Sequence, residues 1–90
     1  LVRCPSVNPD FGGARDGQAQ LAARIEALAA AAGLRTRRLP VGDGSFNLLV
    51  HAEAIAGAEW LLFESHLDTV AVDGMSVPPF ELTRRGERLH

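Results

Sequence analysis

Residues 60–70 read WLLFESHLDTV, and this stretch decides the fold that the sequence predicts. Its first four residues, Trp60 to Phe63, are all apolar and do not alternate with polar residues, which is typical of a central strand covered on both faces. His66 and Asp68 follow that strand directly. Because ligands in open α/β sheets bind beyond the carboxyl ends of the strands, these two side chains are the first candidates for a functional site.

The chain before this stretch predicts one helix. Leu21, Ile25, Leu28 and Ala32 recur at helical spacing in an alanine-rich run that begins after residue 16. We therefore expect these four residues to form the buried stripe. Gly33 supplies the left-handed residue that commonly ends a helix.

Two strands are predicted between that helix and the central strand. Residues 34–40 and 46–52 are separated by the turn sequence Gly-Asp-Gly, which favours antiparallel pairing. Residues 53–59 are too few for a parallel crossover, so we expect a mixed sheet. Residues 80–84 predict a further short strand, and Gly86 predicts a turn. The expected fold class is α/β.

Composition excludes several classes of function. The chain has 90 residues, 47% hydrophobic and 22% charged, with a net charge of −2, as in an ordinary globular protein. No basic stripe offers a surface for nucleic acid, and no apolar run is long enough to cross a membrane. The single cysteine, Cys4, is expected to be a small packing residue. Because one cysteine cannot form an internal disulfide, we expect a soluble protein of the reducing cytoplasm.

His66 and Asp68 are suited to metal chemistry. In an extended segment, residues two apart point to the same side, so the two side chains are expected to lie together. A carboxylate that accepts one imidazole N–H fixes the tautomer and leaves the other ring nitrogen to bind a metal. The alternative is structural: His66 ends a strand and Asp68 caps the turn that follows. His51 is expected to be solvated on the polar face of its strand, and Asp73 to belong to an Asp-Gly turn.

The motif also carries a family resemblance that covers nearly the whole chain. Residues Ser65–Val70, followed by Pro78–Glu81 and Arg85–His90, resemble the dizinc family of acetylornithine deacetylase, succinyl-diaminopimelate desuccinylase, aminoacylases and glutamate carboxypeptidases. Cys4–Pro9 is similar to that family's loop after its first helix, and Asn47 lies where the family often has an asparagine. His66-x-Asp68 is the specific part of the match.

The resemblance implies a fold and a site. Residues 1–90 would be the N-terminal part of a three-layer αβα catalytic domain, without the smaller lid domain that commonly forms a homodimer interface. His66 would bind one of two zinc ions, with cobalt or manganese as possible replacements, and Asp68 would be the catalytic carboxylate that orients it. The other ligands and the glutamate general base would follow a Gly-Arg-Gly segment expected just after His90. The 90 residues alone are therefore expected to be inactive.

The function implied is hydrolysis of an amide bond in a small N-acyl amino acid or a peptide. The alternative from another class is a non-catalytic α/β binding piece, such as a degenerate relative that kept the fold and lost the metals. The residues that follow His90 would discriminate the two hypotheses.

Overall fold

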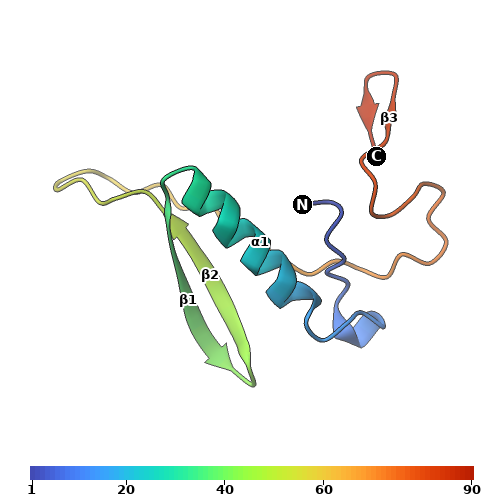
Figure 1. Ribbon diagram of the computed structural model, residues 1–90, viewed down its shortest axis with the longest axis horizontal. Helices are drawn as coiled ribbons and strands as arrows, with labels where there is room; N and C mark the ends of the chain where they lie inside the picture. Colours follow the sequence, from blue (N-terminus) through green and yellow to red (C-terminus); the bar gives the residue numbers. More distant parts are fainter. The chain divides into compact units, whose positions relative to one another are not determined.

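The computed structural model describes all 90 residues, and it is built from one α-helix, one short 3₁₀ helix and four strands (Figure 1). The elements are η1 (Pro9–Phe11), α1 (Gly17–Ala31), β1 (Arg35–Gly42), β2 (Ser45–His51), β3 (Arg84–Arg85) and β4 (Arg88–Leu89). The residues form two compact units, one of Leu1–Leu21 with His66–His90 and one of Ala22–Ser65. No helix is both long and apolar enough to span a membrane.

Helix α1 confirms the predicted helix, including its end. Gly33 adopts the left-handed conformation with φ of 72°. The backbone N–H of Leu34 donates to the carbonyl of Ala29 at 2.9 Å, and that of Gly33 donates to Ala30 at 3.0 Å. These bonds satisfy carbonyls that the last turn of a helix otherwise leaves unpaired.

The buried face of α1 differs from the predicted stripe. Leu21, Ala22 and Ala29 are buried, whereas Leu28 is 49% exposed. At about 100° per residue, the three buried positions share one side of the helix, and Leu28 lies on its flank. The buried side is therefore lined mainly by alanines rather than by the largest apolar side chains of the helix.

Strands β1 and β2 form the predicted antiparallel hairpin, with Arg35 opposite His51 and Gly42 opposite Ser45. Asp43 and Gly44 connect them, and both have positive φ, of 46° and 86°. A two-residue turn of that kind matches the twist of paired strands, which explains the Asp-Gly sequence.

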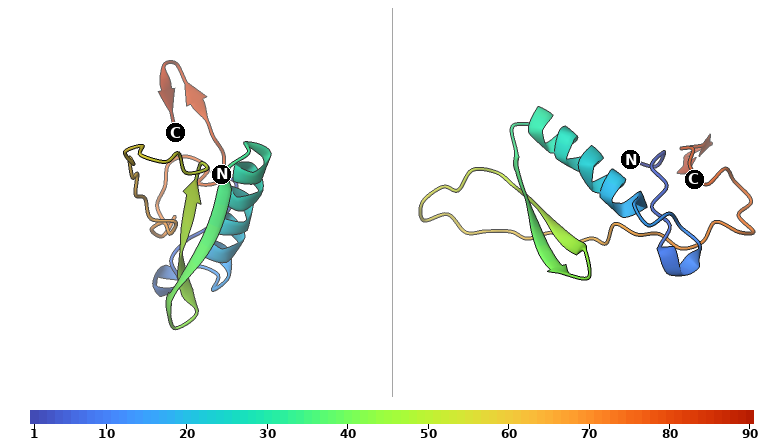
Figure 2. Two further views of the ribbon diagram at one scale, coloured as in Figure 1. Left: turned by 90° about the vertical axis from the view of Figure 1, so that its left-hand side faces the viewer. Right: turned by 60° about the horizontal axis from the view of Figure 1, so that its bottom comes forward.

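An ion pair joins α1 to the hairpin, which runs beside the part of the helix that belongs to the same unit, residues 22–31 (Figure 2). Arg38 donates from Nε and Nη2 to the two carboxylate oxygens of Glu26, at 2.8 and 2.7 Å. These hydrogen bonds hold the pKa of Glu26 below its ordinary value, against a smaller opposing effect of desolvation. The guanidinium also lies 4.6 Å from the ring centroid of Phe46, so the Arg38 side chain contacts both α1 and β2.

The predicted central strand is not formed. Trp60 to Phe63 are in no strand, and their exposures run from 65% at Trp60 to 85% at Phe63. Both sheets have two antiparallel strands, so the predicted mixed sheet is also not formed. An apolar run becomes a central strand only when layers cover both of its faces, and these 90 residues supply one α-helix. The coarser prediction, a chain of mixed helix and strand, is confirmed.

The strand predicted at residues 80–84 lies later in the chain. β3 and β4 pair around Gly86, whose φ is 63°, and Thr83 and His90 exchange two backbone hydrogen bonds of 2.9 Å. The turn at Gly86 is therefore confirmed. It sets the position of the strands, because paired residues must flank it on both sides.

Candidate metal centre

The candidate site is built on two segments that are far apart in the sequence. Val7 and Thr69 form a parallel bridge, in which the N–H of Asn8 donates to the carbonyl of Thr69 at 2.9 Å and the N–H of Thr69 donates to that of Ser6 at 3.0 Å. Ser6 is 3% exposed. This pairing places Asn8 beside Asp68.

The loop around Asn8 is tightly constrained. Its side-chain Oδ1 accepts from the backbone N–H of Asp10 at 2.9 Å and caps η1, while its carbonyl accepts from the N–H groups of Phe11 and Gly13. A Cβ at Gly13 would lie 1.7 Å from the carbonyl oxygen of Val7. Only glycine fits where the loop closes on itself, so the position of Asn8 depends on Gly13.

Asp68 is held by the amide of Asn8. The Nδ2 group of Asn8 donates to Oδ2 of Asp68 at 3.0 Å. This hydrogen bond is the main cause that lowers the pKa of Asp68, helped by a backbone hydrogen bond and by His66, and opposed by desolvation. Asp68 is therefore an ionised carboxylate at neutral pH.

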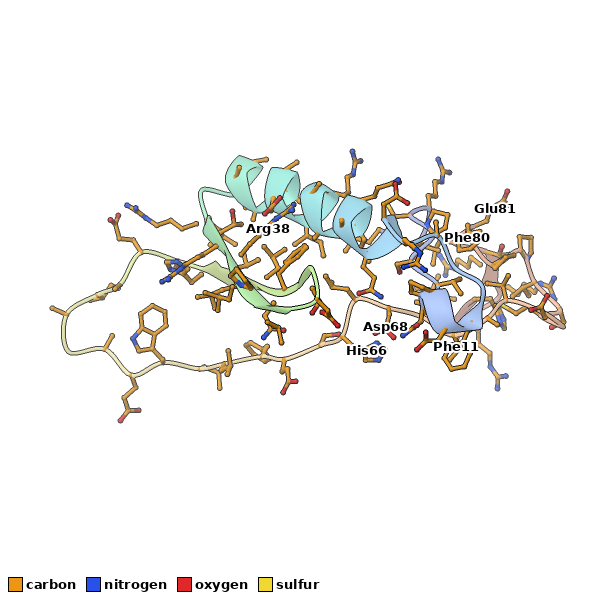
Figure 3. All side chains as sticks on the ribbon, turned by 90° about the horizontal axis from the view of Figure 1, so that it is seen from below. Phe11, Arg38, His66, Asp68, Phe80 and Glu81 are labelled. Atoms are coloured by element: carbon orange, nitrogen blue, oxygen red, sulfur yellow. The ribbon has the colours of Figure 1, made fainter.

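His66 lies against Asp68, and Figure 3 labels both side chains. Its Nδ1 is 2.7 Å from the backbone carbonyl oxygen of Asp68 and 3.3 Å from the carboxylate Oδ1. With the proton on Nδ1, a neutral imidazole carries its lone pair on Nε2, the nitrogen that a metal would bind. The ring is 82% exposed.

The predicted pairing of His66 and Asp68 therefore has a different geometry from the one expected. The sequence predicts that the carboxylate fixes the imidazole, whereas the shorter contact of Nδ1 is to the backbone carbonyl. The carboxylate is shared between His66 and Asn8. Asn8 is the residue that sequence reasoning missed. Its signal was the Asn-Pro-Asp run, typical of an asparagine that caps a short helix.

The other candidates stand apart from this pair. His51 is half-buried, and its ring lies 6.4 Å from that of Trp60 in an edge-on contact. Asp73 lies in an exposed turn in which Met75 donates to the carbonyl of Val72, as predicted. Nowhere in the structure do three His, Cys, Asp or Glu side chains gather as a metal would require. A pocket of about 400 Å³ lies between the loop of residues 5–14 and residues 71–73.

Comparisons with models of known protein families, with curated proteins and with solved structures give no significant match to this chain. His66, Asp68 and Asn8 are the residues whose geometry bears on function, and the first two belong to the His-x-Asp motif.

Proposed function

We propose that the protein containing this chain is a metal-dependent hydrolase of amide bonds in N-acyl amino acids or peptides, and that His66 binds one of its metals. The observation that carries the proposal is the contact of His66 Nδ1 with the Asp68 carbonyl at 2.7 Å. Histidines that bind metals almost always donate their other ring N–H to a carbonyl or carboxylate, and His66 has both within reach.

The donor set fits zinc. A neutral imidazole nitrogen beside a carboxylate is a common zinc environment, although cobalt and manganese accept the same ligands. When bound, two zinc ions in such a hydrolase would polarise the substrate carbonyl and lower the pKa of a bound water. His66 would supply Nε2 as one ligand. The remaining ligands and the general base would come, by the sequence resemblance, from residues beyond this chain.

Asp68 and Asn8 position the ligand in this proposal. Asp68 contacts the imidazole through both its carbonyl and its carboxylate, which sets the ring orientation and the tautomer. Asn8 donates to the other carboxylate oxygen and lowers the pKa of Asp68. The negative charge next to His66 would favour a cation bound at the imidazole.

The wider features follow the same resemblance. The three-layer αβα domain, a separate lid domain, a homodimer and a cytoplasmic location belong to the proposal. Mixed helix and strand in this chain is compatible with the first part of such a domain.

The direct test uses the whole protein. Elemental analysis of the purified protein should find two metals per subunit. A panel of N-acetyl amino acids and dipeptides should be hydrolysed, and chelation should abolish the activity until zinc, cobalt or manganese is returned. A protein that binds none of these metals and hydrolyses no member of the panel would favour the alternative, a non-catalytic α/β binding piece.

A further inference from the structure

Trp60, Leu61, Leu62 and Phe63 form the most conspicuous exposed apolar segment of the chain, with exposures of 65%, 77%, 79% and 85%. All four residue types favour or tolerate strands, and glutamates at 59 and 64 flank them. Contiguous exposed apolar surface of this kind usually marks a surface that another element covers.

The hairpin offers two edges, and they differ in chemistry. The edge of β1 carries Arg35, Arg37, Arg38 and Pro40, and charged side chains and proline are the features that keep another strand from pairing. β2, from Ser45 to His51, has no proline and no lysine or arginine, and most of it is half-buried and apolar. Of the two edges, that of β2 is suited to accept a strand.

The chain already brings Trp60, the first residue of the apolar segment, back to His51, the last residue of β2. The rings of His51 and Trp60 meet edge-on, with centroids 6.4 Å apart and an interplanar angle of 64°. Residues 52–59 reverse the chain between them, and the segment after Trp60 then runs in the opposite direction to β2 (Figures 2 and 3). All these residues belong to the same compact unit.

We propose that Trp60–Phe63 dock on the edge of β2 as a third, antiparallel strand of the hairpin. Continuing the register that the ring contact sets, Leu61 would pair with Val50, Leu62 with Leu49 and Phe63 with Leu48. Leu61 and Phe63 would then share a face with Val50 and Leu48, so that apolar side chains meet apolar side chains at all three pairs beyond His51 and Trp60.

The occupant of the β2 edge is the chain's own segment. The linker of residues 52–59 is short, so the segment stays at a high effective concentration beside β2, and closing such a loop costs little entropy. A second copy of the chain would have to compete with that local concentration. Docking would also order the backbone that leads directly into His66. This inference does not depend on the proposed hydrolase activity.

Engineered disulfides test the register. In the whole protein, with Cys4 and any other cysteine replaced by serine, Val50→Cys with Leu61→Cys should close rapidly within one chain under mild oxidation, since directly paired residues meet the distance that a disulfide needs. Val50→Cys with Leu62→Cys is the matched control, because a one-residue slip turns the side chain to the other face. Equal closure of both pairs, closure of neither, or bonds between chains would overturn the proposal.

Hydrogen exchange on the protein without engineered cysteines provides a second measurement, which does not depend on how the variants fold. The amides of residues 61–63 should exchange at least ten times more slowly than those of the linker at residues 54–58. Equal rates in the two segments would mean that the apolar segment stays undocked.

Discussion

Two neighbouring stretches of this chain are held in opposite ways. Residues 66–69 are polar for the most part. They are fixed by a backbone hydrogen bond to the Ser6 carbonyl and by backbone and side-chain hydrogen bonds from Asn8, which lies 60 positions from Asp68 in the sequence. Residues 60–63 are wholly apolar and are the more exposed of the two. Hydrogen bonds between two loops can fix a segment without a second layer of structure. An apolar run is fixed only when another surface of the protein covers it.

The largest effect is expected from His66→Ala, which tests whether the fixed stretch carries the function. The whole protein should lose one of its metals and nearly all hydrolytic activity, because no nearby side chain can replace one that binds the metal directly. His51→Ala is the matched control: its Nδ1 also lies 2.7 Å from a backbone carbonyl, that of Ala52, but no carboxylate lies beside it. Elemental analysis decides the matter, and a His66→Ala protein that keeps two metals would remove His66 from the site.

Gly13→Ala tests how much the loop that holds residues 66–69 contributes to the free energy of unfolding. A Cβ placed 1.7 Å from the Val7 carbonyl oxygen forces the backbone to move, so we expect a loss of at least about 3 kcal/mol, the upper end for overpacking. At Gly12 an added Cβ meets nothing, but φ is 85°, so Gly12→Ala should cost only about 1–2 kcal/mol. Denaturant unfolding of both variants gives the comparison, and equal losses would show that the close approach at Gly13 relaxes easily.

Asp68→Asn sharpens the comparison within the site. It removes the charge beside His66 but keeps the backbone carbonyl that Nδ1 contacts at 2.7 Å. Changes of this kind typically reduce metal affinity or activity by about 10–100-fold. Asp73→Asn, in an exposed turn, is the control and should have no effect. An unchanged metal affinity in Asp68→Asn would show that the carbonyl alone orients the imidazole, and that Asp68 serves the turn.

The smallest effect concerns pH. Asn8 lowers the pKa of Asp68, so the resulting stability is fully present above the ordinary carboxyl value of about 4 and is lost as pH falls through the lowered pKa. Asn8→Ala should raise the pKa of Asp68 and make stability less dependent on pH in that acid range. An NMR titration of the Asp68 carboxyl measures the shift.

A matched control is available on the first turn of α1. Gln20 Nε2 donates to the carboxylate of Asp16 at 2.7 Å, an exposed counterpart of the part-buried amide–carboxylate pair of Asn8 and Asp68. Gln20→Ala should leave the titration of Asp68 unaltered. If both variants move it equally, the shift does not come from the Asn8 contact.

Local signals predicted most of the regular structure, and contacts between distant residues account for what they missed. Gly33, the Asp43-Gly44 turn and Gly86 each act within a few residues, and all three lie where the sequence indicates. The exposure of Trp60–Phe63 depends on whether other elements pack on the faces of this segment. The local sequence pattern carries no information about those elements. The pairing of His66 with Asp68 could be read from their spacing, but the contact of Asn8 depends on the bridge between Val7 and Thr69.

The residue after Asn8 bears on how long the Asp68 contact survives. Asparagine deamidates to aspartate when the backbone nitrogen of the next residue attacks the side-chain amide carbon. This reaction needs an N–H on that nitrogen. Residue 9 is proline, which has none. An aspartate at position 8 would set a second carboxylate against Asp68 in place of a donor, and the two charges would repel. Pro9 therefore protects the candidate site from slow chemical decay as well as shaping the start of η1.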